Sequence, residues 1–210
     1  MYIPNAYRED DQATLVAFMR ANSFATLVSI DNGAPVATHL PLVVEEVDGA
    51  VRLTGHVAKA NPQWQAFGVG EALAIFQGPH AYISPSHYGA HESVPTWNYI
   101  AVHAYGVPVP LSAAGSQAAL EAMMATMIDA YEPSYHAQWE SLTTRYRDGM
   151  LRGVVGFTLA VTRLEGKTKL SQNRSADDQR RVAHALLASD DGAARATGDA
   201  MQRHIDEAEG

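Results

Sequence analysis

A histidine and a lysine precede a proline-marked turn in residues 53–64, which read LTGHVAKANPQW. We expect a strand to end near His56 and a helix to begin at Asn61, because asparagine is a favoured N-cap and Pro62 then takes the first helical position. Free N–H groups at a helix N-terminus attract anions, and the Lys59 ammonium adds a full positive charge. The spacing favours a phosphate-binding turn over an incidental lysine beside a helix cap.

A second dense group of polar side chains occupies residues 167–175, KTKLSQNRS. Cations, hydroxyls and the amides of Gln172 and Asn173 are packed there between an expected strand and an expected helix that Ser175 caps. An exposed turn would account for the charges but not for the amides, so this density favours a ligand site.

Residues 78–99, GPHAYISPSHYGAHESVPTWNY, contain three prolines and three histidines interleaved with aromatic residues. Proline fixes the backbone and removes donors, while aromatic rings supply flat, rigid surface. The segment is interpreted either as the wall of a pocket for a planar ligand or as a surface loop pinned by its prolines.

Other chemistries have weaker signals. His87 and His91 are four residues apart, but the residues between them do not predict the helix that zinc ligation at this spacing needs, so no metal site is expected. Ser84 and Ser86 lie near histidines without a GxSxG motif, which argues against a hydrolase. Haem ligation by a single histidine leaves no spacing pattern and stays open.

Short strands must position these groups. The pair Asn32-Gly33 between two β-rich runs predicts a hairpin, and strands are expected over residues 24–30, 34–44, 50–57, 72–77, 96–109 and 153–166. Thr38 and His39 interrupt an otherwise apolar strand, where a lone histidine is more often a neutral hydrogen-bonding group than a catalyst. Helices are expected over residues 13–22, 61–68, 116–131, 177–189 and 192–208. Sequential hairpins with peripheral helices predict a small antiparallel barrel.

Composition narrows the class of protein. The chain has 210 residues, 47% hydrophobic and 18% charged, with no cysteine and no apolar run long enough to span a membrane. The N-terminal residues do not read as a secretory signal, and the absence of cysteine is consistent with the cytoplasm. The net charge of −8 argues against general affinity for nucleic acid, although residues 145–181 hold nine basic and four acidic side chains. This local basic segment suits a small anion better than a DNA duplex.

Five motifs in order, MYIPNAY, GHVAKANPQW, GPHAYISPSHY, VPTWNY and KLSQNRS, resemble those of the PaiB-like FMN-binding negative transcriptional regulators. The resemblance implies an α+β fold: a six-stranded antiparallel split β-barrel with peripheral and C-terminal helices, similar to that of pyridoxamine phosphate oxidases. It further implies a homodimer with FMN at the interface. The barrel domain is expected over residues 1–174, with a C-terminal helical extension of the same domain over residues 175–210.

The resemblance also implies cofactor contacts. Lys59, with His56 and Asn61, matches the turn that holds the FMN phosphate, and the strand bearing Thr38, His39 and Leu40 would run along the flavin. This strand lacks the basic residues of the oxidases. Trp97 and Asn98 would approach the flavin from a later strand. Four residues of the 167–175 segment would complete the anion site or contact the ring edge: Lys169, Ser171, Gln172 and Arg174.

A flavin-responsive regulator is therefore the leading interpretation, with DNA binding weak or indirect. A flavin-dependent reductase or oxidase acting on a small substrate is the first alternative, since the cofactor itself carries the redox chemistry. A haem-binding split barrel is the second, with His80, His87 or His91 as ligand.

Overall fold

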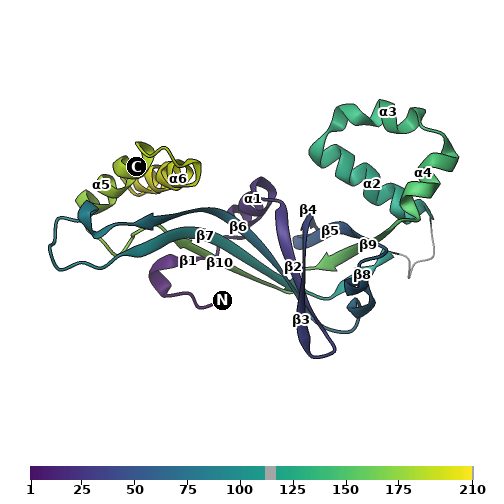
Figure 1. Cartoon of the computed structure of the whole chain (residues 1–210), viewed down its shortest axis with the longest axis horizontal. Coiled ribbons are helices and arrows are strands. Elements are labelled where there is room, and N and C mark those ends of the chain that lie inside the picture. The colour runs from purple at the N-terminus through teal and green to yellow at the C-terminus, as the bar shows by residue number, and fades with distance from the viewer. Residues whose placement is uncertain (112–116, 210) are drawn as a thin grey trace. The chain divides into compact units, whose positions relative to one another are not determined.

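The computed structural model of the chain describes residues 1–111 and 117–209, which form ten strands in two antiparallel sheets together with helices (Figure 1). These residues divide into two compact units. Unit 1 comprises residues 1–15, 77–102 and 165–210, and unit 2 comprises residues 16–76 and 103–164. Strands β6 (Ala72–Ile83) and β7 (Thr96–Gly106) contribute residues to both units. The class is α+β, as predicted.

Unit 2 is built around strands that pair with their neighbours in sequence. β2 (Phe24–Asp31) pairs with β3 (Ala34–Pro41) and with the first residues of β6. β5 (Ala50–Ala58) lies between β4 (Val43–Val47) and β9 (Val154–Ala160), and β9 also pairs with β8 (Pro108–Pro110). In the hairpin turns, Asn32, Gly33, Asp48 and Gly49 all have positive φ, the conformation that tight two-residue hairpins require. The predicted Asn-Gly hairpin is confirmed.

Strands change sheets at short corners, and for this reason the number of strands exceeds the six expected. The predicted strand over residues 34–44 breaks at Leu42, so that β3 belongs to the six-stranded sheet and β4 to the four-stranded one. Val107 separates β7 from β8, and residues 161–162 separate β9 from β10 (Arg163–Lys169) in the same way. Such corners let two sheets share one core.

Unit 1 has a sheet with helices on one face. β1 (Arg8–Glu9) pairs with β10, Arg8 opposite Lys167 and Glu9 opposite Gly166. Helices α5 (Ala176–Leu187) and α6 (Gly192–Glu209) pack on the part of the sheet that β6 and β7 give to this unit (Figure 1). Their shared core contains Ile83, Leu170, Val182, Leu186, Met201 and Ile205.

The remaining helices are α1 (Gln12–Ala21), α2 (Gln117–Tyr131), α3 (His136–Ser141) and α4 (Thr144–Leu151). The Asp11 carboxylate caps α1 by accepting from the Thr14 N–H at 2.8 Å, and the Ser175 hydroxyl caps α5 by accepting from the Asp178 N–H at 3.2 Å. Helices α2, α5 and α6 confirm the helices predicted over residues 116–131, 177–189 and 192–208, although Ser116 lies outside the described residues. α3 and α4 were not predicted, because their short polar segments lack a clear apolar period.

Residues 78–83 continue strand β6, so the expectation that the strand ends at residue 77 is wrong. Alternate residues there point to the helices, with Ala81 and Ile83 buried and His80 and Tyr82 exposed. Only residues 84–95 are irregular, apart from one 3₁₀ turn at Pro85–His87. None of the described helices is long and apolar enough to cross a membrane.

Candidate functional site

The turn that follows β5 is held by its backbone. The Lys59 N–H donates to the Gly153 carbonyl at 2.8 Å, and the indole N–H of Trp64 donates to the Lys59 carbonyl at 3.0 Å. The Asn61 N–H closes the turn on the Ala58 carbonyl at 2.9 Å. The side chain of Lys59 is exposed. A fixed backbone thus presents a solvated ammonium, which is the arrangement that an anion-binding lysine needs.

Thr38 and Asn61 lie together, as members of one hydrogen-bonded network. The Asn61 amide Nδ2 donates to the Thr38 hydroxyl at 2.8 Å, and this hydroxyl donates to the Gln63 carbonyl oxygen Oε1. The Asn61 carbonyl oxygen Oδ1 also accepts from the Gln63 backbone N–H at 3.0 Å, which confirms Asn61 as the cap. β3 and the turn are therefore locked to one another.

Gln63 is the centre of this network and was not predicted. Its side chain is 1% exposed, and its Nε2 donates to the Leu27 carbonyl at 3.0 Å, the Ser29 hydroxyl at 3.0 Å and the Val36 carbonyl at 3.3 Å. It thereby ties the turn to both β2 and β3. Its position inside the motif NPQW was the only signal in the sequence that could have found it.

The prediction of an α-helix over residues 61–68 is wrong. The segment forms a single 3₁₀ turn, Pro62–Ala66, and so has no helix dipole to attract an anion. The helix cannot continue because the Phe67 ring packs edge-on against Phe157 at 4.9 Å between centroids, and Gly68 follows with φ +82°. Any anion held at this turn must therefore be held by Lys59 and local donors.

The other predicted residues of unit 2 face different surroundings. His39 is exposed and stacks on Phe24, with 6.5 Å between ring centroids, whereas Leu40 is buried. The imidazole of His56 is directed to helix α2, where its Nδ1 lies 3.3 Å from the Met127 sulfur. Burial lowers the pKa of His56 below its ordinary value. β3 is the last strand of its sheet, so its outer backbone edge has no strand partner among the described residues.

The predicted residues of unit 1 include a buried pair. The Asn98 amide is fully buried and donates to the Ser171 hydroxyl at 2.9 Å, and this hydroxyl donates to the Asn98 carbonyl oxygen at 3.3 Å. The Asn98 amide also lies 3.3 Å from the sulfur of Met201 on α6. Ser171 adopts φ +69°, an uncommon backbone conformation for a residue with a side chain. These hydrogen bonds hold β7 to the 167–175 segment.

Gln172 and Arg174 also make contacts within unit 1. The Gln172 side chain accepts from the Leu170 N–H at 2.7 Å and donates to the Thr168 carbonyl at 2.6 Å, which closes the turn after β10. The Arg174 guanidinium lies 4.2 Å from the ring centroid of Tyr88. The amide of Gln172 therefore shapes the turn, a role that the sequence did not reveal.

Lys169 and Trp97 present their functional groups on the same part of the sheet. The Lys169 ammonium donates to the Thr96 hydroxyl at 2.6 Å. Burial lowers the pKa of Lys169 below its ordinary value; the charge of Lys167 acts in the same direction and Tyr99 opposes both. Trp97 is 51% exposed, and its ring lies 6.1 Å from those of His80 and Tyr82.

The twelve predicted site residues thus fall into two sets of six. Unit 2 holds Thr38, His39, Leu40, His56, Lys59 and Asn61, and unit 1 holds Trp97, Asn98, Lys169, Ser171, Gln172 and Arg174. Within the sets, Thr38 contacts Asn61 and Asn98 contacts Ser171. The chemistry available is a solvated cation on a rigid turn, an open strand edge and exposed aromatic surface.

Known proteins share this fold. With 14% identity, the structure of the flavocytochrome Anf3 from Azotobacter vinelandii matches with a TM-score of 0.61, over 78% of this chain and 69% of that chain. A FAD and heme binding protein from Mycobacterium smegmatis matches at 16% identity with a TM-score of 0.58, over 82% and 78% of the two chains. At these identities the likeness shows the fold alone.

Sequence comparison is more specific. The protease synthase and sporulation protein PAI 2 of Bacillus subtilis is 40% identical over 189 residues, which cover 89% of each chain. An uncharacterized protein of Emericella nidulans, AN0679, is 26% identical over 85% of this chain and 87% of its own. Residues 1–163 match the family model described as "Putative FMN-binding domain". The chain therefore belongs to this family of FMN-binding domains, together with its PaiB-like relative PAI 2.

Proposed function

We propose that the chain binds FMN, as a homodimer with the flavin at the subunit interface. The observation that carries the proposal is the Lys59 turn, where hydrogen-bonded backbone presents an exposed ammonium inside the matched family region. The absence of cysteine supports the cytoplasm as its location.

The residues of unit 2 fit the chemistry of FMN. Its phosphate needs a cation and hydrogen-bond donors, and the exposed Lys59 ammonium supplies both. The pyrimidine edge of the ring carries donors and acceptors, and the outer edge of β3 beside Thr38 and His39 offers backbone groups of both kinds. Bound flavin supplies one- or two-electron redox chemistry, whereas these residues bind and orient it.

The residues of unit 1 remain predicted contacts. Trp97 and Tyr82 offer exposed aromatic surface suited to a flavin ring. The side-chain hydrogen bonds of Asn98, Ser171 and Gln172 are internal to the unit, so for these residues we expect a supporting role in shaping the 167–175 turn.

The proposal is tested by titrating the purified protein with FMN, riboflavin and FAD while following flavin fluorescence, and by measuring its mass in solution. We expect a dimer that binds FMN more tightly than riboflavin, because riboflavin lacks the phosphate that Lys59 would neutralise. Equal affinity for FMN and riboflavin would contradict the phosphate site, and tighter binding of FAD would replace FMN as the cofactor. A monomer that still binds FMN would contradict the interface.

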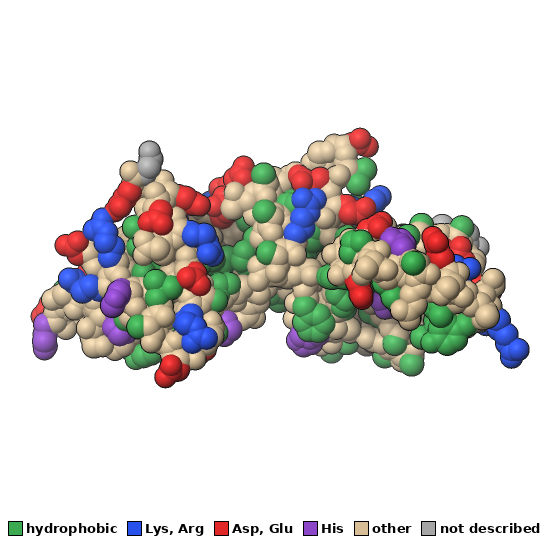
Figure 2. Space-filling view, turned by 90° about the horizontal axis from the view of Figure 1, so that it is seen from above, with side chains coloured by type: hydrophobic (Ala, Val, Ile, Leu, Met, Phe, Trp, Pro, Cys, Tyr) green, Lys and Arg blue, Asp and Glu red, His purple; other side chains and the backbone are tan. Residues whose placement is uncertain are grey.

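We further propose that flavin binding serves a regulatory role, as the resemblance of the five motifs to the PaiB-like negative transcriptional regulators implies, and that contact with DNA is weak or indirect. Three arginines of the 145–181 segment are paired with carboxylates: Arg163 with Glu71, Arg180 with Asp177 and Arg181 with Asp178. In Figure 2, acidic and basic side chains are interspersed over the C-terminal helices at the left of the view. Paired charges release few counterions on binding a phosphate backbone.

A gel-shift assay at physiological salt tests the regulatory proposal, with bleaching of the flavin by NADH or NADPH as a parallel measurement. Weak, salt-sensitive shifts without bleaching support an indirect regulator. Tight sequence-specific shifts would overturn the indirect role. Rapid bleaching by a reduced nicotinamide would favour a flavin-dependent oxidoreductase instead.

A further inference from the structure

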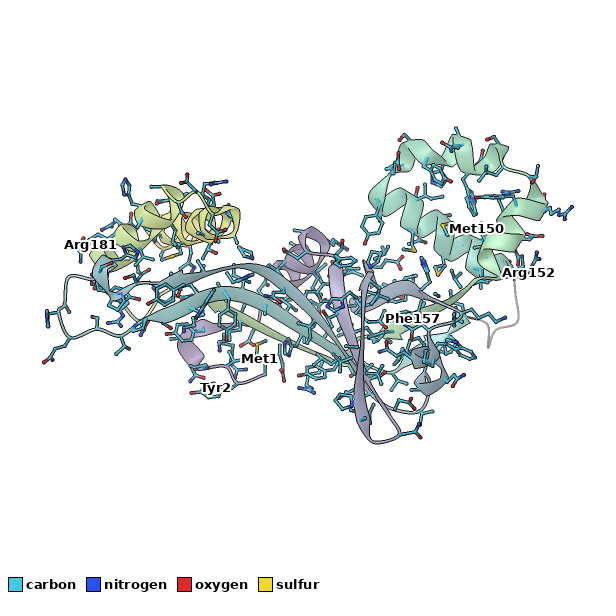
Figure 3. All side chains as sticks on the ribbon, viewed as in Figure 1. Met1, Tyr2, Met150, Arg152, Phe157 and Arg181 are labelled. Atoms are coloured by element: carbon cyan, nitrogen blue, oxygen red, sulfur yellow. The ribbon has the colours of Figure 1, made fainter. Side chains whose placement is uncertain are left out.

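Two lysines lie on one face of β10 in unit 1. Lys167 and Lys169 are two residues apart in a strand, so their side chains leave the same side of the sheet. Lys167 is 7% exposed; its ammonium donates to the Tyr2 carbonyl at 3.1 Å and lies 5.7 Å and 5.0 Å from the ring centroids of Tyr2 and Tyr99. The Lys169 ammonium lies 6.0 Å from the Tyr7 ring. The N-terminal segment, with Met1 and Tyr2 labelled in Figure 3, therefore forms one wall around two cations.

Neither ammonium has a carboxylate partner among the residues that the structure describes. The acidic groups nearest in sequence have other contacts: Glu165 pairs with the amino group of Met1, and Glu9 accepts from the Asp11 N–H at 2.9 Å. Buried charges in proteins are normally paired, and tyrosine rings compensate an ammonium less completely than a carboxylate does. Two adjacent, partly desolvated ammonium groups therefore form a site of uncompensated positive charge.

Exposed aromatic residues adjoin this charge. Trp97 and Tyr99 lie two residues apart on β7 and so share a face, the face that Tyr99 presents to Lys167. Asn98, between them, points the other way into the core beneath α6. Trp97 in turn contacts the rings of His80 and Tyr82 on β6. An exposed aromatic surface thus runs beside the two ammonium groups.

We propose that this face binds a small planar oxyanion as a second ligand beside the flavin, its carboxylate or phosphate at Lys167 and Lys169 and its ring against Trp97. A charge-assisted hydrogen bond from Lys169 holds the anionic group, the buried charge of Lys167 adds to the attraction, and stacking orients the ring. The proposal takes both Lys169 and Trp97 from the cofactor to this second ligand, and leaves Tyr82 to the flavin ring. It does not depend on flavin binding, since the site lies within unit 1.

The test is calorimetric titration of the purified protein with benzoate and with inorganic phosphate, before and after saturation with FMN, at matched ionic strength. We expect both anions to bind, and benzoate to bind the FMN-saturated protein equally well. Lys169→Gln should raise the dissociation constants of both anions by about tenfold or more, because a charge-assisted hydrogen bond is lost. Trp97→Ala should lower the affinity for benzoate but leave the affinity for phosphate unchanged.

Two controls keep the result specific. Arg195→Gln removes an exposed positive charge from α6 and should leave both affinities unchanged, whereas an equal loss would show nonspecific attraction and overturn the proposal. Lys167→Met, checked for folding by its melting temperature, should also weaken the binding of both anions, because a nearby positive charge is removed. Absence of anion binding, or displacement of benzoate by FMN, would also overturn the proposal of a second ligand. If the protein binds the anions but not FMN, the result counts only against the proposed function.

Discussion

The Asn61 side chain donates a hydrogen bond to the Thr38 hydroxyl at 2.8 Å, across 23 residues of sequence. Both residues were predicted to contact the same cofactor, and the structure places them in one network through the buried Gln63. The network fixes the turn that carries Lys59 against β3, the open strand of its sheet. Because the turn is already held in place, less free energy is lost to ordering the protein when a ligand binds there.

Removing the Thr38 hydroxyl should loosen this link. We expect Thr38→Val to lower the free energy of unfolding by about 1–3 kcal/mol, because Gln63 loses a donor and Asn61 an acceptor in a partly buried setting. Urea denaturation measures the change. Thr38→Ser keeps the hydroxyl and should remain close to the original stability; a similar loss in both variants would contradict the assigned hydrogen bonds.

Removing the Lys59 charge should weaken the binding of FMN, because this charge acts on the FMN phosphate. We expect Lys59→Ala to raise the dissociation constant for FMN by about ten- to a hundredfold, the worth of a charge-assisted hydrogen bond. Flavin fluorescence titration measures it, and the affinity for riboflavin should not change. Lys59→Arg retains the charge and should retain most of the affinity. An unchanged FMN affinity in Lys59→Ala would exclude this lysine from the phosphate site.

The buried Asn98 should matter for stability. Asn98→Ala removes both hydrogen bonds to Ser171 and opens a small cavity beneath α6, so we expect a loss of about 2–4 kcal/mol in the free energy of unfolding. Denaturant unfolding followed by circular dichroism checks this loss. The exposed Asn173, in the 167–175 segment that Asn98 contacts, is the matched control, and Asn173→Ala should have little effect. Equal effects would show that burial of Asn98 is not what matters.

Stability should fall in mild acid because of His56. Burial holds its pKa in the folded protein below the unfolded value of about 6.5, so the unfolded chain binds the proton more tightly. The contribution of neutral His56 is fully present above that value and is lost as the pH falls toward the folded pKa, by at most about 1.4 kcal/mol per pH unit. Urea denaturation between about pH 7.5 and 5 should show a shallower pH dependence in His56→Gln than in the original protein. Identical slopes would rule out His56 as the source.

Gly166 should tolerate no side chain. A Cβ there would lie 2.3 Å from Leu15 Cδ2 and 2.8 Å from the Glu9 carbonyl oxygen, where β1 pairs with β10. We expect Gly166→Ala to cost about 1–3 kcal/mol through overpacking. Gly70→Ala is the control, because a Cβ at Gly70 meets no atom within 4 Å. Thermal unfolding of the two variants should separate them clearly, and equal melting temperatures would contradict the close strand approach.

Local signals in the sequence determined several elements and motifs. The Asn32-Gly33 turn, the Ser175 cap and the Asn61 cap all depend on backbone chemistry within a few residues, and each appears as predicted. The motif order identified the family, since five short motifs in register carry information that no single one has. Lys59 could be found in the same way, because a lysine between a strand end and a proline-marked turn needs only local context.

Tertiary structure alone decided the rest. The corner at Leu42 and the long strand β6 depend on which sheet each residue joins, and side-chain alternation is the same in either sheet. The turn at Pro62 stays a single 3₁₀ turn because Phe67 must reach Phe157, ninety residues away. Gln63, Asn98 and the Lys167–Lys169 pair acquire their roles from burial and distant partners. Sequence thus specified the residue types and local turns, whereas long-range packing determined which polar groups are buried and which remain available to a ligand.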